Sequence, residues 1–252
     1  MKIIKVILTI AAKEIKVLFV SPLAWVFLAA IQLILTWVFL GRLDAFIELQ
    51  SQLMLIANPP GATEVIIVPV YAVASIVLLM ATPLLTMRLM AEEWRNHTMP
   101  LLMAAPVTVT AIVLGKFAGL MIFFLIIISL VGLLPFSLFL GGTMDLGLIL
   151  SNTMGLLLLA ASFVSLGLYV SSLTYHPAIA AAGTLGLLMM LWIIDIVSTD
   201  LGNLLPNLSL LKHYEQFNRG MIDSFSVIFF MLFIISFLVL TIRRLDGSRL
   251  HG

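Results

Sequence analysis

One interval between two apolar runs combines acidic, basic and aromatic side chains within a few residues of one another. Its members are Arg88, Glu92, Glu93, Trp94, Arg95, Thr98, Leu101, Leu102 and Pro106. A short helix with charged groups on one side and the leucine pair on the other can lie along a membrane and dock a cytosolic partner. A solvated loop between two membrane spans accounts for the same composition equally well. The residues alone leave both interpretations open.

The residue types that most often carry catalysis or bind metals are sparse in this chain. It has no cysteine, which excludes disulfides, thiolate nucleophiles and cysteine metal sites. The four histidines lie in separate segments without a metal-ligand spacing, so we expect no metal site. The patterns H-E-x-x-H, G-x-S-x-G and the phosphate-binding loop G-x-x-x-x-G-K-S/T are also absent. We therefore expect no catalytic residue and no cofactor in this chain.

Composition places the chain in a lipid bilayer. Of its 252 residues, 62% are hydrophobic and only 10% are charged, and the mean hydropathy is +1.22. A soluble domain needs more charge to cover its surface, whereas a surface that faces lipid must be apolar. No basic patch interleaves with aromatic residues, so nucleic acid is not an expected partner. We expect one all-α membrane domain over residues 1–252.

Six apolar segments are long enough to cross a bilayer as helices, which takes about 20 residues. They are 22–41, 67–89, 111–140, 146–173, 178–197 and 225–242. Trp25 and Trp37 lie near the two ends of the first segment, as interfacial aromatic residues do. The third is long enough to tilt or to break near Pro135. Residues 42–66 are polar and rich in turn residues, so we expect a loop there.

Residues 2–20 predict an amphipathic helix that lies in the membrane interface. Its basic stripe consists of Lys2, Lys5, Lys13 and Lys16. The charges at Lys13, Glu14 and Lys16 interrupt the apolar run that a signal peptide requires. Four lysines would be costly inside a span, which favours an interfacial helix with its lysines toward anionic headgroups over the start of a long first span. Ser21-Pro22 then turns the chain into the bilayer.

The distribution of lysine and arginine predicts the orientation. With the N-terminus in the cytoplasm, the inner segments hold ten of the 13 basic residues, and the outer loops hold only Arg42, Lys212 and Arg219. The opposite orientation would invert this ratio. We expect both ends of the chain on the cytoplasmic side.

Several small or polar residues lie within the spans. The segment 146–173 has a polar face that suits either a dimer contact or a substrate surface, formed by Ser151, Asn152, Thr153, Ser162, Ser165, Ser171 and Ser172. Asp195 is either a functional ionisable group within a span or a residue at the outer interface, and we favour the interface. The glycines placed to allow close helix approach are Gly115, Gly119, Gly183 and Gly186.

The interval described first resembles the signature of permease subunits of ABC type-2 exporters. Those proteins carry an arginine, a Glu-Glu pair, basic residues, Gly-Thr-Leu-Glu, a Leu-Leu pair and Pro-Val or Pro-Ile, and a Leu-Gly-Lys opens the next span. The matching positions here are Arg88, Glu92, Glu93, Arg95, Thr98, Leu101, Leu102, Pro106, Val107 and Leu114-Gly115-Lys116. The chain departs from the pattern at His97, where glycine is usual, and at Pro100, where the second glutamate is usual. These departures concern the local turn and one polar contact.

A second motif precedes the last span and is similar to His-Phe-Glu-x-Phe-x-Arg-Gly-Val-Ile-Asp in the gliding-motility branch of these permeases. The matching positions are His213, Glu215, Phe217, Arg219, Gly220 and Asp223. With the amphipathic start and the six-span layout, the resemblance covers essentially the whole chain. Its motifs are specific for the family and not for a substrate.

The resemblance implies a permease of an ATP-driven exporter in the prokaryotic cytoplasmic (inner) membrane. Two permease copies, identical or related, would form the translocation path, and two copies of a cytosolic ATPase would bind ATP and Mg. An accessory subunit with an extracytoplasmic domain would be a further partner. The helix between spans two and three would be the coupling helix, with Glu92, Glu93 and Arg95 in charge contacts with the ATPase and Leu101 and Leu102 packed on it. Residues 198–224 would form re-entrant helices between spans five and six, whereas the residues alone also fit an amphipathic helix on the outer surface.

Other classes of membrane protein compete with this interpretation. A secondary transporter that works without ATP would show paired broken helices or ion-binding carboxylates at mid-membrane, whereas the middle of most spans here has no charge. A membrane anchor of a gliding or assembly machinery would use ATPase coupling for assembly. An intramembrane enzyme would need a catalytic dyad in the bilayer, and only Asp195 approaches that.

Overall fold

The computed structural model describes residues 2–53, 61–104, 107–140, 145–197 and 209–251, and its regular elements in these ranges are all helical. Helices suit the apolar runs because a backbone in lipid must satisfy its own hydrogen bonds. The α-helices are α1 (Lys2–Val20), α2 (Pro22–Leu53), α3 (Val68–Thr86), α4 (Ala91–Arg95), α5 (Met99–Ala104), α6 (Val109–Leu133), α7 (Leu146–Leu173), α8 (Pro177–Val197), α9 (Leu210–Asn218) and α10 (Ser224–His251). A π-helical turn η1 (Thr63–Ile67) precedes α3, and a 3-10 segment η2 (Leu134–Leu140) follows α6.

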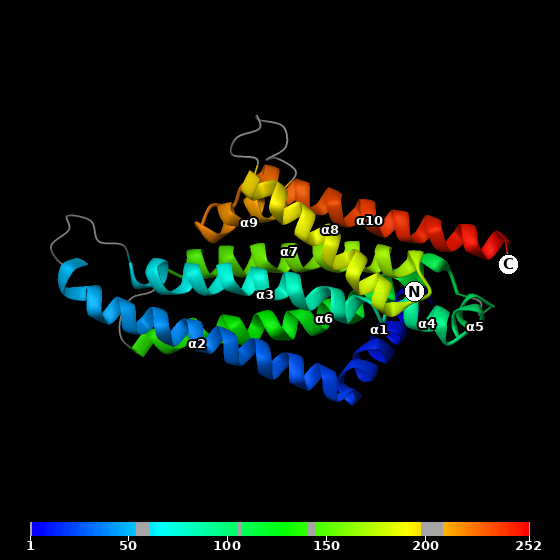
Figure 1. The fold of residues 1–252 in the computed structure, drawn as a ribbon, viewed down its shortest axis with the longest axis horizontal. Helices are drawn as coiled ribbons and strands as arrows, with labels where there is room; N and C mark the ends of the chain where they lie inside the picture. The colour runs from blue at the N-terminus through cyan, green and yellow to red at the C-terminus, as the bar shows by residue number, and fades with distance from the viewer. Residues whose placement is uncertain (1, 54–60, 105–106, 141–144, 198–208, 252) are drawn as a thin grey trace.

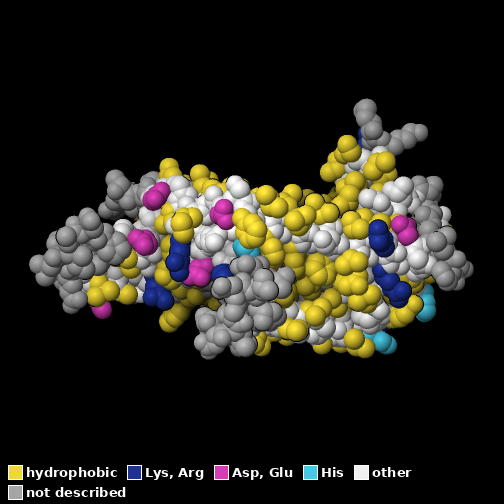
Figure 2. Space-filling model, turned by 90° about the horizontal axis from the view of Figure 1, so that it is seen from above, with side chains coloured by type: hydrophobic (Ala, Val, Ile, Leu, Met, Phe, Trp, Pro, Cys, Tyr) yellow, Lys and Arg dark blue, Asp and Glu magenta, His cyan; other side chains and the backbone are white. Residues whose placement is uncertain are grey.

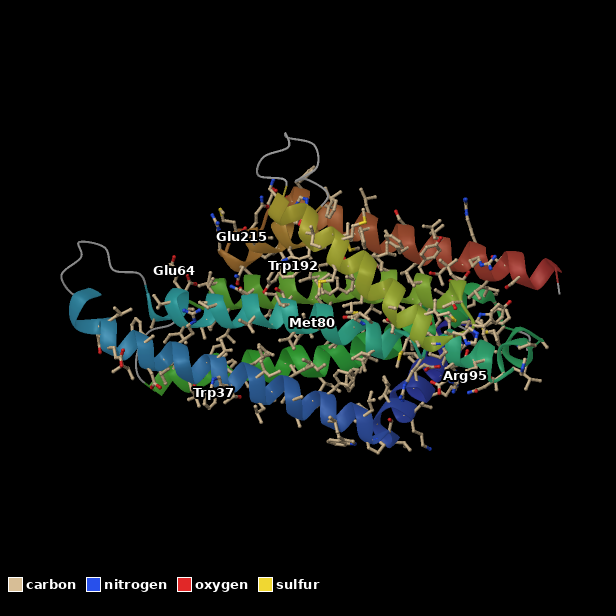
Figure 3. All side chains as sticks on the ribbon, viewed as in Figure 1. Trp37, Glu64, Met80, Arg95, Trp192 and Glu215 are labelled. Carbon is tan, nitrogen blue, oxygen red and sulfur yellow. The ribbon has the colours of Figure 1, made fainter. Side chains whose placement is uncertain are left out.

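Helix α7 is the centre of the bundle. It contacts α3, α6, α8, α9 and α10, and most of its side chains are buried. The long helices lie roughly along the long axis of the molecule, with α2 on one side and α10 on the other (Figure 1). Only 22% of the most apolar part of α2 and 28% of that of α10 are buried inside the bundle, as expected of helices that face lipid. Trp37 on α2 points away from the bundle (Figure 3).

The two ends of the bundle carry different elements. Both chain termini, α4 and α5 lie at one end of the long axis (Figure 1), and Glu64 and Glu215 lie toward the other end from Arg95 (Figure 3). On the face seen in Figure 2, hydrophobic side chains cover the middle, and charged side chains gather toward the two ends. This distribution fits a protein whose middle is surrounded by lipid and whose ends meet water.

Five helical stretches of the described residues are long and apolar enough to cross a membrane. They are Pro22–Gln50, Thr63–Arg95, Val109–Leu138, Leu146–Leu173 and Ser224–Ser248. These stretches correspond to five of the six predicted spans. The remaining predicted span, 178–197, coincides with α8, of which Pro177–Ile193 is a shorter apolar helix. The side chain of Asp195 and residues 198–208 lie outside the described part.

The prediction of a loop over 42–66 is wrong for most of the described residues of this segment, because α2 and η1 extend into it. Helix α2 continues to Leu53, well past the predicted end of the first span at residue 41. The reason is that a helix does not have to end where the apolar run ends, because polar residues such as Arg42 and Glu48 are good helix formers. The break expected near Pro135 is confirmed, since α6 ends at Leu133 and a tighter helix follows.

The polar face predicted on residues 146–173 points into the protein. Ser151, Asn152 and Ser171 on α7 are buried. The Ser151 hydroxyl donates to the backbone carbonyl of Phe217 at 2.9 Å, and the Asn152 amide donates to the carbonyl of Asn218 at 3.3 Å. Ser151 and Asn152 hold α9 against α7, and Ser171 bonds to the turn before α4, so these buried residues make contacts within the chain and do not form an open dimer or substrate surface.

Candidate functional site

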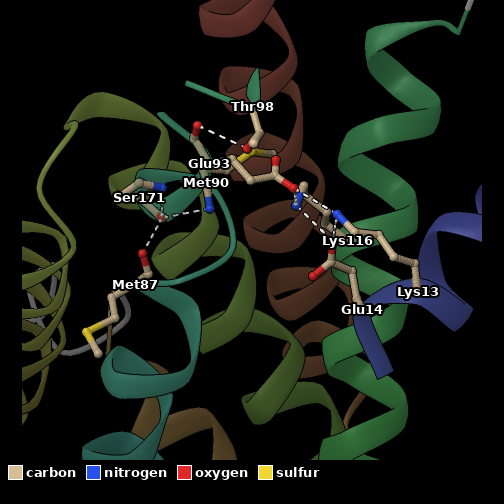
Figure 4. A network of polar contacts seen from close by, with 9 residues as sticks. Lys13, Glu14, Met87, Met90, Glu93, Thr98, Lys116 and Ser171 are labelled. Carbon is tan, nitrogen blue, oxygen red and sulfur yellow. Dashed lines mark hydrogen bonds and ion pairs between the residues drawn. The ribbon is translucent and has the colours of Figure 1, made fainter. Parts of the chain in front are cut away.

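The interval predicted to couple to a partner folds as two short helices at the end of the bundle that holds both termini (Figure 1). Helix α3 ends at Thr86, and a turn leads into α4. Ser171 of α7 fixes this turn (Figure 4): its hydroxyl donates to the carbonyl of Met87 at 3.2 Å and accepts from the backbone N–H groups of Met90 and Ala91 at 3.2 and 3.1 Å. The position of α4 is therefore tied to the central helix.

The connection between α4 and α5 depends on an unusual backbone conformation at His97. Its φ is +56°, in the left-handed region that favours glycine. This is the position where the resembling permeases usually have glycine. The turn is closed by Thr98, whose backbone N–H and hydroxyl both donate to the carbonyl of Glu93, at 3.0 and 3.3 Å. The departure from the family pattern leaves the turn in place, with histidine in a glycine conformation.

A cluster of four charged side chains joins α1, α4 and α6 (Figure 4). The Lys116 ammonium on α6 lies 2.9 Å from Glu14 Oε1 on α1 and 2.9 Å from Glu93 Oε1 on α4. Lys13 Nζ lies 3.1 Å from the same Glu93 oxygen and 3.5 Å from the same Glu14 oxygen. Only 1% of the Lys116 side chain is exposed, so its charge is compensated almost entirely by these two carboxylates. We call these four residues the ionic cluster.

The ionic cluster changes the interpretation of two predicted residues. Glu93 was expected to face a partner, but its carboxylate faces the protein interior and pairs with lysines of the same chain. Lys13 was expected to face lipid headgroups, but it pairs with the two glutamates. Burial by itself lowers the pKa of Lys13, yet Glu14 and Glu93 more than offset this effect, so the pKa lies above its usual 10.5.

Helix α1 packs lengthwise on α6, which explains why its polar residues reach the interior. A Cβ on Gly115 would lie 2.7 Å from Ile10 Cβ, and a Cβ on Gly119 would lie 2.8 Å from Glu14 Cβ. Larger residues at these two positions would push α1 away, so the prediction of close helix approach there is confirmed. Of the other predicted lysines of the basic stripe, Lys5 and Lys16 are exposed, and the side chain of Lys2 lies outside the described part.

A cavity of about 590 Å³ lies beside the ionic cluster, between α1, α2, α3, α4 and α5. Six residues of the predicted coupling interval line it: Arg88, Glu92, Glu93, Thr98, Leu101 and Leu102. Leu101 is 73% exposed at its rim. The cavity therefore brings together residues that the sequence places on separate elements.

The remaining residues of the interval do not line this cavity. Trp94 stacks edge-on against Tyr175, with ring centroids 5.2 Å apart, so it packs on the turn between α7 and α8. Arg95 is exposed to solvent. Pro106 lies outside the described residues.

The second family motif, residues 213–223, has a structural role that is visible in the contacts of α9. His213 and Phe217 are buried, and His213 Nδ1 lies 3.0 Å from the Ser226 hydroxyl. The backbone of Gly220 has a φ of +81°, and a Cβ there would lie 2.9 Å from a methyl group of Leu148, so this position requires glycine.

The exposed members of the same motif contact residues that are close to them in the sequence. Glu215 and Arg219 form an ion pair of 2.6 Å on the surface of α9. Asp223 Oδ1 accepts from the backbone N–H of Phe225 at 3.3 Å, near the start of α10. The motif therefore docks α9 on α7 and connects it to α10.

The sequence did not predict that three residues belong to the site: Glu14, Lys116 and Ser171. Lys116 was named only as part of the family motif and among the inner basic residues, Ser171 only as part of a polar face, and Glu14 only as an interruption of the apolar run. One signal was present, since Glu14 is the single acidic residue in the basic stripe of residues 2–20. A lone carboxylate among lysines on a helix that meets small residues of a span suggests a buried partner.

The chain matches a known protein family. The sequence profile of a family described as "ABC-2 family transporter protein" matches residues 8–225, which extend from α1 to the start of α10. No curated protein matched the sequence significantly.

Proposed function

The chain belongs to the ABC-2 family of transporter membrane proteins, and from this premise we propose that it couples, as the permease subunit of an exporter, to a separate cytosolic ATPase. Membership makes it a multi-pass transmembrane permease of an ABC-type transporter, which works with an ATP-binding component and is not itself catalytic. The observation that carries the coupling proposal is the surface formed by α4 and α5. This surface combines an exposed leucine, Leu101, with an exposed cation, Arg95.

The contacts behind this surface support a route from the partner to the spans. Glu93 of α4 is paired with Lys116 of α6, and Lys116 is paired with Glu14 of α1. The Ser171 hydroxyl bonds the turn before α4 to α7. A displacement of α4 by the ATPase would therefore move α1, α6 and α7 together, as a rigid-body switch requires.

The residues that we propose to contact the ATPase differ from those predicted from the sequence. Leu101 and Arg95 make direct contacts with the ATPase. Glu93 acts through Lys116 and is a positioning residue. Glu92 lines the cavity and has no ion pair within the described residues.

The finer features of the transporter follow the family resemblance. We propose six spans with both ends in the cytoplasm of a prokaryote, and a re-entrant segment within 198–224 that ends in α9. Two permease copies would form the export path, and two ATPase copies would bind ATP and Mg. An accessory subunit with an extracytoplasmic domain and a place in the gliding-motility branch are part of the same proposal, the latter because of the motif at 213–223.

Co-purification with the ATPase tests the coupling proposal. The tagged chain is co-expressed with its ATP-binding component, extracted in mild detergent and captured, and the bound ATPase is quantified. Leu101→Asp and Arg95→Glu are each expected to reduce the captured ATPase about tenfold, as loss of an interface anchor does. The matched control is Met221→Asp, because Met221 is also exposed but lies at the other end of the bundle.

The outcomes separate the competing functions. A secondary transporter predicts that no ATPase is captured by the wild-type chain. A different docking surface predicts capture that Leu101→Asp and Arg95→Glu leave unchanged. An assembly anchor predicts capture without any change in ATP hydrolysis after reconstitution in liposomes, whereas an exporter predicts that the permease alters the hydrolysis rate.

A further inference from the structure

The cavity beside the ionic cluster contains charged groups that the protein does not satisfy. Arg88 and Glu92 both line it and are only partly exposed, and neither side chain has a hydrogen bond or ion pair within the described part of the chain. The Oε2 atom of Glu93 is buried and also lacks a hydrogen-bond partner there. Unlike that enclosed atom, Arg88 and Glu92 are accessible from the cavity, so a ligand can reach two unpaired side chains of opposite charge there.

The charges of the lining specify the charge of that ligand. The lining contains three cations and three carboxylates: Lys13, Arg88, Lys116, Glu14, Glu92 and Glu93. Because their formal charges cancel, the cavity has no excess positive charge to attract a purely anionic group. The unpaired guanidinium of Arg88 suits a phosphate, and the unpaired carboxylate of Glu92 suits an ammonium group that can donate hydrogen bonds. A zwitterionic ligand with both groups satisfies both residues.

The remaining walls of the cavity, and its position at the level of the lipid headgroups, indicate that this ligand is a lipid. Leucine and valine side chains of α1, α2, α3 and α5 complete the lining, and Val17 and Leu101 are exposed at its rim. Ser21, where α1 turns into α2, also lines it. Trp25 lies one turn further on, is exposed, and donates from its indole to the carbonyl of Phe19 at 3.0 Å. An exposed tryptophan at a turn between an interfacial helix and a span marks the headgroup level of a bilayer.

We propose that this cavity binds a phospholipid whose headgroup carries a phosphate and a primary ammonium, the chemistry of phosphatidylethanolamine. The phosphate contacts Arg88, and the ammonium donates to Glu92. The acyl chains lie along the apolar walls between α1 and α2. The volume of about 590 Å³ falls in the range of small-ligand sites, about 300–1,000 Å³. The inference depends only on this end of the bundle lying at a membrane interface, and not on the ATPase.

A series of lipids that differ only in their headgroups tests the proposal on the unmodified protein. The purified, delipidated chain in detergent micelles is titrated with lipids of identical acyl chains, and bound lipid is counted by native mass spectrometry. The lipids are phosphatidylethanolamine, its N-methyl and N,N-dimethyl forms, phosphatidylcholine and phosphatidylglycerol. Affinity should fall as N–H donors are removed and should be about tenfold weaker for phosphatidylcholine, which has none. Phosphatidylglycerol should bind no better than phosphatidylcholine.

A pair of matched variants tests the assigned residues. Arg88→Gln with Glu92→Gln removes one cation and one anion from the cavity and should abolish the preference for phosphatidylethanolamine over phosphatidylcholine. Arg42→Gln with Glu48→Gln makes the same charge changes on exposed positions of α2 outside the cavity and should retain the preference.

Each contrary result overturns a stated part of the proposal. Equal binding of phosphatidylethanolamine and phosphatidylcholine by the wild-type chain, or an unchanged preference in Arg88→Gln with Glu92→Gln, would refute the site. Tightest binding of phosphatidylglycerol would show an anion site instead. Free phosphoethanolamine should not compete at the same concentration, because it lacks acyl chains, and effective competition would exclude a lipid as the ligand.

Discussion

Replacing Lys116 by methionine removes the only buried cation of the ionic cluster and leaves two carboxylates facing each other. At an effective dielectric constant of about 20, two unit charges about 4 Å apart attract by about 4 kcal/mol. The cost of removing water from the three groups offsets much of this attraction, but deleting one partner of a buried pair still destabilises a protein by about 3–5 kcal/mol. The side chains of Glu14 and Glu93 are 10% and 15% exposed, and Lys13 stays close to both. We therefore expect a loss near the lower limit, about 3 kcal/mol.

Thermal unfolding in detergent micelles at a fixed scan rate measures this loss. For a chain of this length about 3 kcal/mol corresponds to a decrease in Tm of roughly 6–12 °C. Lys16→Met is the matched control, because Lys16 is an exposed lysine on α1 with no ion pair within the described residues, and its Tm should stay within about 2 °C of wild type.

A combined variant distinguishes lost ion pairing from lost packing. Lys116→Met with Glu14→Gln and Glu93→Gln contains no unpaired buried charge, so it should recover at least half of the lost stability. If Lys116→Met unfolds within about 2 °C of wild type, or if the combined variant is less stable than Lys116→Met alone, the reasoning about the ionic cluster is wrong.

Three further predictions concern the glycine contacts, the turn after α4 and pH. Gly155→Ala should lower Tm, because its Cβ would lie 2.5 Å from Phe217 Cβ and force α9 from α7, whereas Gly186→Ala, with nothing within 4 Å, should not. His97→Gly should raise the free energy of unfolding by about 0.5–1 kcal/mol in the same assay, because glycine adopts a φ of +56° without strain. The raised pKa of Lys13 means that its ion pairs contribute stability below pH 10.5 and lose it as the pH rises through the higher folded-state pKa. A Tm series from pH 7 to 11 should therefore show a decline above pH 10.5 that is smaller in Lys13→Met, and a decline beginning at neutral pH would contradict this assignment.

The positions of most helices were predictable because they depend on local properties of the sequence. The apolar runs, Pro135 and the Ser21-Pro22 turn each determine structure within a few residues, and the helices end or break close to these positions. The end of α2 was not predictable from hydropathy, because helix formation and membrane burial impose different limits on residues such as Glu48.

The contacts of the site depend on residues far apart in the sequence, and this is why they could not be predicted. Glu14 and Lys116 are 102 positions apart, and their pairing requires α1 to pack on α6. The glycines at 115 and 119 indicated that some helix would approach, but not which one. The inward orientation of Glu93 likewise follows from that packing, because α1 and α6 supply its two lysine partners.

Site-directed photocrosslinking tests the central claim that a separate ATPase docks on α4 and α5. Because the chain has no cysteine, Leu101→Cys introduces a single attachment point for a benzophenone probe. Met221→Cys, which lies after α9 near the start of α7, provides the same probe at the other end of the bundle. In membranes that contain both proteins, the account predicts that the ATPase crosslinks to the probe at position 101 and not to the probe at position 221. Crosslinking from position 221, or from neither position while the ATPase co-purifies, would contradict it.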